Sequence, residues 1–379
     1  MTTGSPGFFW TVLSFLLVIG PLIFVHELGH YFVGRWFGVK AEVFSIGFGR
    51  EIAGWTDKRG TRWKVAWLPL GGYVKFAGDM NAASEPSPEW LALPPEERAR
   101  TLQGKPVWQR FLVVAAGPLT NFLFAILIFC GFLVAFGQAR TPPVVAAVAP
   151  GSAAQQAGIL AGDEIVSIEG SGVGRFEDIA RLVVLHPGEE LDVSVLREGR
   201  PLALKVTPKP VVERDQFGNE FRRGMLGVAA PARPVLEPVP PLQVLPAALR
   251  QTWQIVDTTL EGLGQIVTGR RSVDELGGPL KIAKFSGEQA SLGPLDFVWF
   301  LAIISINLGF INLLPIPLLD GGHLLFYAIE GIRRKPLRPK AQEWAFRTGL
   351  ALLLMLMIFV TLNDLASFGL WSKLGGLIG

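Results

Sequence analysis

Long apolar stretches without charged side chains dominate the hydrophobic pattern of the chain. Four stretches stand out: 1–25, 111–139, 297–319 and 348–363. A helix of about 20 apolar residues crosses the hydrocarbon core of a bilayer and satisfies its own backbone hydrogen bonds there. The pattern therefore predicts a polytopic α-helical membrane protein with about four transmembrane helices. The fourth stretch is short, and we expect its helix to include Phe346 or the apolar residues 365–371.

The basic residues predict how these helices are oriented. Of the 35 Lys and Arg residues, 12 lie between the first two stretches and six between the last two. Because positive charge close to span ends favours the cytoplasmic side, both of these connections should face the cytoplasm. Both termini and residues 140 to about 295 should then lie outside. No Lys or Arg precedes the first apolar run, so we expect a retained span rather than a cleaved signal peptide.

Alternating residues after the first span predict a small β-sheet beside the membrane. Trp63, Val65 and Trp67 alternate with polar or small residues, which is typical of a strand with one apolar face. The sequence DKRG at 57–60 predicts a turn. Residues 81–105 are rich in proline and acidic residues, so we expect a solvated loop with one short helix there.

The composition between the second and third spans indicates a soluble module. Residues 141–208 show short strand patterns around two helical stretches, which predicts a compact α+β fold. The segment resembles a PDZ domain in Ala149–Gly151 and in AGILAGDEIVSI at 157–168. A PDZ domain binds an extended peptide or a C terminus by strand addition, so the resemblance implies such a partner. We expect residues 211–245 to form a Pro-rich linker with one strand at 225–229.

We therefore expect four parts in the chain. They are 1–139 with two spans and the sheet, 140–210 with the PDZ-like domain, 211–295 with the linker and amphipathic membrane-surface helices, and 296–379 with the last two spans. Half of the chain is hydrophobic and only 18% is charged, which excludes an ordinary soluble globule and a disordered chain. The net charge of +3 is too small and too dispersed to indicate a nucleic-acid partner.

The sequence HELGH stands at the end of the first span. His26 and His30 are four residues apart, so on a helix both imidazoles point the same way and can hold one Zn²⁺. Glu27 is then placed beside the open position of the metal. Ionisable groups at membrane depth are costly, and they persist mainly where they are paired, bind a metal or serve a function. The motif therefore predicts a catalytic zinc site.

A third protein ligand is needed, because a catalytic zinc usually has three. Asp320 follows the third apolar stretch, close to Pro315 and Pro317. The prolines forbid a regular helix there, so we expect the Asp320 carboxylate to be presented from non-helical backbone. His323, three residues further on, is the alternative ligand or a residue that supports the site.

Five signals in this order resemble the site-2 protease family of intramembrane zinc metalloproteases, in particular its RseP-type members, the regulator of sigma-E proteases. They are HELGH at 26–30, SIGFG at 45–49, PLGGYVKF at 69–76, AAGPLTN at 115–121 at the opening of the second span, and NLLPIPLLDGGH at 312–323, with the PDZ-like insert between the last two. The resemblance implies that His26, His30 and Asp320 bind zinc. It also implies that Glu27 is the catalytic acid and base, and that Asn312 helps to hold the substrate or the intermediate.

The resemblance further implies regulated intramembrane proteolysis in a bacterial inner membrane. The substrate would be a single-span protein such as an anti-sigma factor or a remnant signal peptide, cut in or near its transmembrane segment after its external domain is trimmed. The active site would lie towards the cytoplasm, and the PDZ-like domain would filter substrates outside. Many relatives of this type carry tandem PDZ domains, whereas this chain has room for one.

Two further expectations concern substrate binding and rival functions. An edge strand of the sheet at 39–76 is expected to pair with the unwound substrate, which proline at Val65 or Trp67 would disturb. A membrane adaptor with a structural zinc site and a metal transporter are the alternatives. A transporter would not need the glutamate of HELGH, and four spans offer few other polar groups for a pathway.

Overall fold

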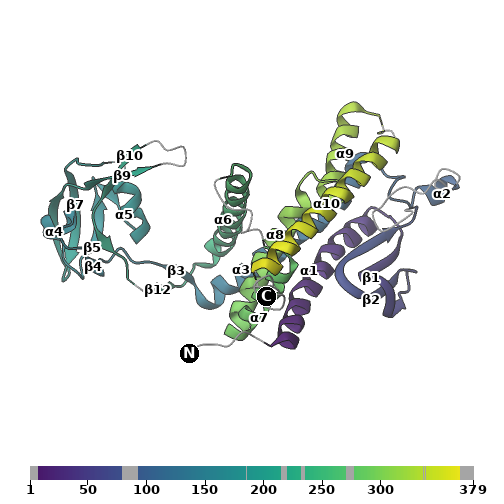
Figure 1. Ribbon diagram of the computed structural model, residues 1–379, viewed down its shortest axis with the longest axis horizontal. Helices are drawn as coiled ribbons and strands as arrows, with labels where there is room; N and C mark the ends of the chain where they lie inside the picture. Colours follow the sequence, from purple (N-terminus) through teal and green to yellow (C-terminus); the bar gives the residue numbers. More distant parts are fainter. Residues whose placement is uncertain are drawn as a thin grey trace, which may run out of the picture. The chain divides into compact units, whose positions relative to one another are not determined.

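The computed structural model describes residues 7–78, 93–184, 186–214, 220–231, 235–269, 277–335, 337 and 339–367. The chain forms two compact units. The first consists of Met1–Cys130 with Leu245–Gly379, and the second of Gly131–Val244. In Figure 1 the first unit contains the long helices with one sheet, and the second contains most of the strands.

Four helices in the described part of the chain are long and apolar enough to cross a bilayer. They are α1 (Phe8–Trp36), α3 (Val107–Phe136), α8 (Pro294–Leu313) and Gln342–Ala366 within α10 (Pro339–Ser367). They correspond to the four predicted stretches, so the prediction of a polytopic membrane protein is confirmed. The third is shorter than predicted, because it ends at Leu313 and not at Leu319. Leu314 is extended, as a residue before proline usually is.

The segment after α8 differs from the prediction at Asp320. This residue is not on non-helical backbone but is the first residue of α9 (Asp320–Arg333). The non-helical part is confined to 314–319, where Leu318 has a positive φ of 84°. Gly322 lets the first turn of α9 approach this segment, since a Cβ there would lie only 2.5 Å from the Ile316 oxygen. The prolines thus end α8 without preventing a new helix at the carboxylate.

Two long strands, β1 (Ala41–Thr56) and β2 (Arg62–Phe76), form the sheet that lies beside α1 in Figure 1. The predicted turn at 57–60 joins them. The carboxylate of Asp57 accepts hydrogen bonds from the backbone N–H groups of Arg59 and Thr61, at 2.8 and 2.9 Å. Together with a stronger contribution from Trp63 Nε1, which donates to Asp57 Oδ2 at 3.0 Å, these bonds hold the pKa of Asp57 below its ordinary value, against the opposing effect of burial.

The register shows that both strands bend back on themselves. Residues 43–46 pair with 72–75 and also with 62–65. Val65 therefore has Ile46 as one partner and Ala53 as another, so the expectation that Val65 lies on a free edge was wrong. The expected apolar face is also divided, because Trp63 stacks on Phe44 whereas Val65 and Trp67 are exposed. The register shifts along β1 explain this, since bulges turn a strand about its axis.

The second unit has the expected α+β composition. A four-stranded sheet has the order β6 (Ser171–Gly172), β5 (Glu164–Ile168), β7 (Leu191–Arg197), β8 (Arg200–Val206), with α4 (Ala153–Gln156) and α5 (Phe176–Val183). Its core contains Ile159, Ile165, Val193 and Ile179, all at most 2% exposed. The carboxylate of Asp163 accepts from Arg197 Nη2 at 2.7 Å and from the N–H of Leu160 at 2.8 Å. The Arg197 hydrogen bond holds the pKa of Asp163 below its ordinary value.

Strands also continue beyond residue 210, where we expected a linker with one strand at 225–229. The remaining described strands of this unit are β3 (Gln138–Arg140) and β4 (Ala147–Val148), which precede the module's sheet, and β9 (Lys209–Arg214), β10 (Glu220–Met225), β11 (Val228–Ala229) and β12 (Val235–Glu237), which follow it. β9 pairs with β10, β4 with β11, and β3 with β12. Leu226 is buried in the core of the unit, so this segment folds onto the module instead of linking it to the next part.

Three further helices belong to the expected pattern. They are α2 (Pro95–Arg98), α6 (Pro241–Val267) and α7 (Pro279–Leu292). Helix α2 is the short helix expected in 81–105, and residues 81–92 of that predicted loop lie outside the described part of the chain. The carboxylate of Asp364, near the end of α10, accepts hydrogen bonds from the backbone N–H groups of Gly278 and Lys281, both at 3.1 Å. These bonds satisfy two donors at the start of α7 and join it to the last span.

Candidate metal centre

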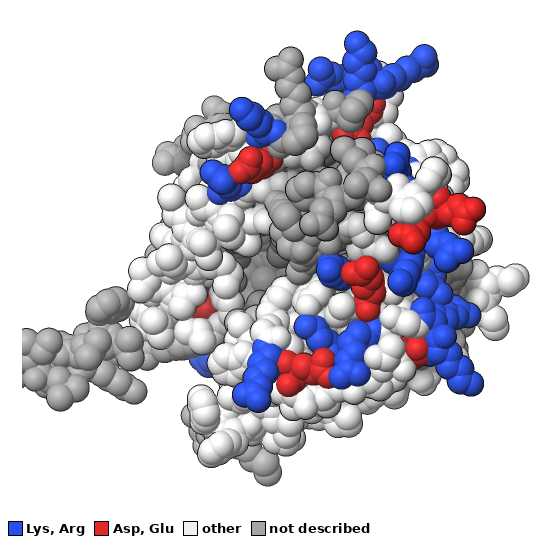
Figure 2. All heavy atoms as spheres, turned by 90° about the vertical axis from the view of Figure 1, so that its right-hand side faces the viewer, with Lys and Arg blue, Asp and Glu red and all other residues white. Residues whose placement is uncertain are grey.

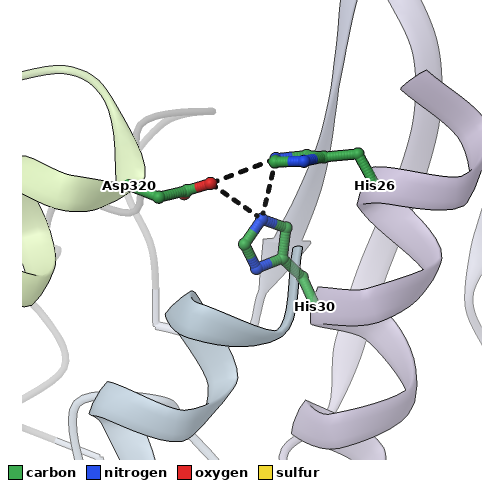
Figure 3. Close-up of side chains that lie close together, drawn as sticks. All are labelled: His26, His30 and Asp320. Carbon is green, nitrogen blue, oxygen red and sulfur yellow. Dashed lines mark hydrogen bonds and ion pairs between the residues drawn. The ribbon is translucent and has the colours of Figure 1, made fainter. Parts of the chain in front are cut away.

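Three side chains from two distant parts of the sequence meet beside α1. His26 and His30 lie on one face of α1, and Asp320 reaches them from the start of α9, as Figure 3 shows. The Nε2 atoms of the two imidazoles are 3.2 Å apart. Asp320 Oδ2 is 3.1 Å from His26 Nε2 and 3.5 Å from His30 Nε2. The imidazoles therefore point the same way, as their spacing predicted.

These distances fit a tetrahedral zinc ion. Zinc–ligand bonds of about 2.0 to 2.1 Å place two tetrahedral ligand atoms roughly 3.3 Å apart. The three separations here, between 3.1 and 3.5 Å, lie close to that value. In addition, Asp320 Oδ2 is buried, and it forms ion-pair contacts with the Nε2 atoms of both imidazoles. A buried carboxylate oxygen that faces two imidazole nitrogens at these distances lies where a third zinc ligand is needed.

His323 is not part of this group. Among the described residues, the one group of three or more His, Cys, Asp or Glu side chains that could hold a metal is His26, His30 and Asp320. The His323 ring packs instead against Phe346, with 5.1 Å between ring centroids. The geometry therefore favours Asp320 as the third ligand.

Helix α3 holds the ring of His30 in its position. His30 Nδ1 lies 2.9 Å from the backbone oxygen of Val113. Nδ1 therefore donates its proton, and the lone pair on Nε2 faces the group. Gly117, also on α3, leaves room for the imidazole, because a Cβ there would lie 2.9 Å from His30 Cδ2.

His26 has a partner that was not among the predicted site residues. The amide Nδ2 of Asn121, on α3, lies 3.1 Å from His26 Nδ1, and Asn121 is fully buried. The segment 115–121 was expected to open the second span, but it lies inside α3, which begins at Val107. A side-chain amide inside an uncharged span is costly unless it is paired. The presence of Asn121 within the second apolar stretch could therefore have identified it as a candidate site residue.

The helix that carries Asp320 is fixed to α3 at two levels. Leu324 and Tyr327 of α9 pack against Val114 and Ala115. Further along, Glu330 is 4% exposed and accepts a hydrogen bond from Arg110 Nη2 at 3.1 Å. A buried pair of this kind is costly to break, because one charge would be left without a partner. The position of Asp320 is thereby tied to the helix that supports both imidazoles.

Glu27 lies beside the three potential ligands and is 7% exposed. Strand β2 comes close to it, because Gly72 and Val74 of this strand line the same cavity as Glu27. Gly72 permits this approach, since a Cβ there would lie 2.9 Å from Glu27 Cγ and 2.6 Å from Ile23 Cγ2. Gly72 was not among the predicted site residues, although it lies in the segment 69–76.

A cavity of about 400 Å³ opens at these residues. It is lined by Ile23, His26, Glu27, His30, Phe48, Gly71, Gly72, Tyr73, Val74, Phe76, Leu102, Val113, Val114, Leu308, Asn312, Leu318, Leu319, Asp320, His323 and Leu353. All five predicted site residues are among them, including Asn312 from the last turn of α8. The structure thus brings the whole candidate site to one cavity beside β2.

Comparison with known proteins gives the family. Peptidase family M50 matches residues 14–356. A relative in Rhizobium meliloti that carries a zinc metalloprotease name is 45% identical over 360 residues, which cover 94% of this chain and 96% of the relative. Another with such a name, in Agrobacterium fabrum, is 45% identical over 361 residues, with 94% and 96% covered. Metalloprotease MmpA of Caulobacter vibrioides is 39% identical over 394 residues, with 98% and 99% covered.

The family match includes at least part of each of the four bilayer-length helices and both parts of the candidate site. The resemblance to site-2 proteases is confirmed at the level of the family, and the expected zinc cofactor with it. The chain therefore belongs to peptidase family M50, the site-2 protease family, and is a zinc metalloprotease of the membrane.

Proposed function

We propose that this protease cuts single-span membrane proteins in or near their transmembrane segments, with His26, His30 and Asp320 as its zinc ligands. One observation carries the proposal. The three potential ligand atoms lie 3.1 to 3.5 Å apart, next to a helix of bilayer length and at a cavity of about 400 Å³. A peptide bond can be hydrolysed at such a site only if the substrate segment enters the membrane-embedded part of the protein.

Two other side chains have roles in this proposal. Bound zinc supplies a Lewis acid that lowers the pKa of a coordinated water and polarises the scissile carbonyl. Glu27 accepts a proton from the attacking water at its carboxylate and later gives it to the leaving nitrogen, because it faces the same cavity as the ligands. The side-chain amide of Asn312 donates a hydrogen bond to the substrate carbonyl or to the oxygen that develops charge.

The substrate segment lies along residues 71–74 of β2 in this proposal, and not along Val65. A transmembrane helix hides its carbonyl groups in its own hydrogen bonds, so it must unwind before it is cut. An unwound segment is extended and can bind next to a strand. Residues 71–74 line the cavity, and the first two are glycines that expose their backbone.

Gly72→Ala is expected to lower kcat/KM by about tenfold while the zinc content is unchanged. The new Cβ would meet Ile23 Cγ2 at 2.6 Å, so β2 must move away from Glu27 and from the bound substrate. Gly20→Ala on α1 is the control, because nothing lies within 4 Å of its Cβ. Wild-type kinetics in Gly72→Ala, or loss of zinc together with activity, would contradict a role in holding substrate.

We also propose a bacterial inner-membrane location with the active site towards the cytoplasm. Figure 2 supports this orientation, because it shows Lys and Arg side chains gathered on a face of the molecule that includes the sheet side of Figure 1. Positive charge at span ends favours the cytoplasmic side. The second unit would then lie outside, where its PDZ-like segment at 141–208 would filter substrates that still carry external domains.

Purified protein in detergent, given single-span substrates with and without a folded external domain, tests the proposed function. We expect cuts in or next to the transmembrane segment, located by mass spectrometry, and only in the trimmed substrates. A variant that lacks 141–231 should cut both kinds; the deletion must include β11, because this strand pairs with β4. Cuts confined to soluble segments would contradict the proposed substrate class. An inactive deletion variant would contradict the filter.

A further inference from the structure

We propose that Asn121 is a positioning residue that fixes the tautomer of His26. In this arrangement its side-chain oxygen accepts the Nδ1–H of the imidazole. Asn121 lies on α3, is 0% exposed, and has its amide 3.1 Å from His26 Nδ1. The inference rests on the zinc ligands proposed above, and it concerns how one of them is prepared to bind.

The two imidazoles need the same tautomer to bind one ion. Their Nε2 atoms are 3.2 Å apart and both face Asp320, so both must offer a lone pair at Nε2. A neutral imidazole has one N–H, which must then be at Nδ1 and requires an acceptor. For His30 that acceptor is the backbone oxygen of Val113, at 2.9 Å. For His26 the neighbouring group is the amide of Asn121.

The orientation of this amide decides the tautomer. When Nδ2 faces the imidazole, the amide donates to Nδ1, and the proton of His26 is held on Nε2, where it blocks the metal. In that orientation Asn121 Oδ1 is buried without a hydrogen-bond partner among the described residues. A half-turn about the Cβ–Cγ bond exchanges the two atoms. The oxygen then gains the N–H of His26 as its partner, and the lone pair on Nε2 is free.

The backbone of Asn121 is fixed independently of this contact. Ser305 on α8 is fully buried, and its hydroxyl donates to the backbone oxygen of Asn121 at 2.8 Å. This bond holds α3 against α8 at the level of the amide. It therefore provides a matched control, because Ser305 supports the same position without touching the imidazole.

Two substitutions at Asn121 separate tautomer control from packing. Asn121→Leu keeps the volume but removes the acceptor, so we expect the zinc dissociation constant to rise by about 10- to 100-fold. Asn121→Asp is acceptor-only and can hold the Nδ1–H, so it should stay within a few-fold of the wild-type value. A packing role predicts the opposite order, because leucine suits an apolar helix contact and a buried carboxylate does not.

The measurement is competition for zinc between a chromophoric chelator and the purified full-length protein in detergent, with thermal unfolding of the metal-free protein as a check on folding. Asn121→Ala serves as a second acceptor-free variant, and Ser305→Ala should bind zinc like the wild type. Equal losses in Asn121→Leu and Asn121→Asp, or wild-type affinity in both Asn121→Leu and Asn121→Ala, would overturn the inference. Wild-type affinity in His26→Ala would instead overturn the proposed ligand set.

Discussion

Replacing Glu27 with Gln is expected to lower the rate of peptide cleavage by about 10²- to 10⁴-fold, while zinc binding stays at the wild-type level. Gln has nearly the same shape as Glu, but its amide cannot accept and return a proton at neutral pH. Glu27 lies at the cavity but is not one of the three side chains whose ligand atoms converge. The substitution should therefore remove proton transfer and leave the metal in place.

Single-turnover cleavage of a single-span peptide and zinc analysis of the same preparation check this expectation. Glu42→Gln is a suitable control, because Glu42 is a partly exposed carboxylate on β1 that pairs with Lys75 at 3.3 Å. It should cut at the wild-type rate. Loss of zinc in Glu27→Gln would make Glu27 a ligand, and an unchanged rate would place proton transfer on another group. Either result contradicts the role proposed here.

The local part of the site was predictable from the sequence. The spacing of His26 and His30 within an apolar run is enough to place both imidazoles on one helix face, and α1 has that arrangement. The four spans were predictable for the same reason, because bilayer-length helices depend on composition alone. Asp320 is 290 residues beyond His30 and was assigned mainly through family resemblance. The spacing of residues along the chain does not predict a contact between two residues so far apart in the sequence.

The parts that were missed depend on contacts between elements. Val65 reads as one residue in an alternating strand, yet it has partners on both sides because β1 and β2 bend back. Leu226 reads as part of a linker but completes the core of the second unit. Asn121 became visible as a partner of His26 only once α3 was placed against α1. In each case the local pattern is compatible with several neighbours, and tertiary packing selects one.

The second large effect is expected at Gly117, where alanine should weaken zinc binding by about 100-fold or more. A Cβ at this position would lie 2.5 Å from His30 Cε1 and 2.9 Å from His30 Cδ2. Neither distance is possible between non-bonded carbon atoms, so the imidazole must leave its place or α3 must move away from α1. Displacing a metal ligand from its set position removes most of the benefit of a preformed site.

Gly131→Ala in the same helix separates this steric effect from helix propensity. Nothing lies within 4 Å of a Cβ at Gly131. Alanine in a helix interior is favoured over glycine by roughly 0.5 to 1 kcal/mol, so this control should bind zinc normally and unfold at a slightly higher temperature. Gly117→Ala receives the same propensity gain, and any loss of zinc affinity must therefore come from the contact with His30. Chelator competition on both variants measures the difference, and equal affinities would show that α3 does not enclose His30 as closely as described.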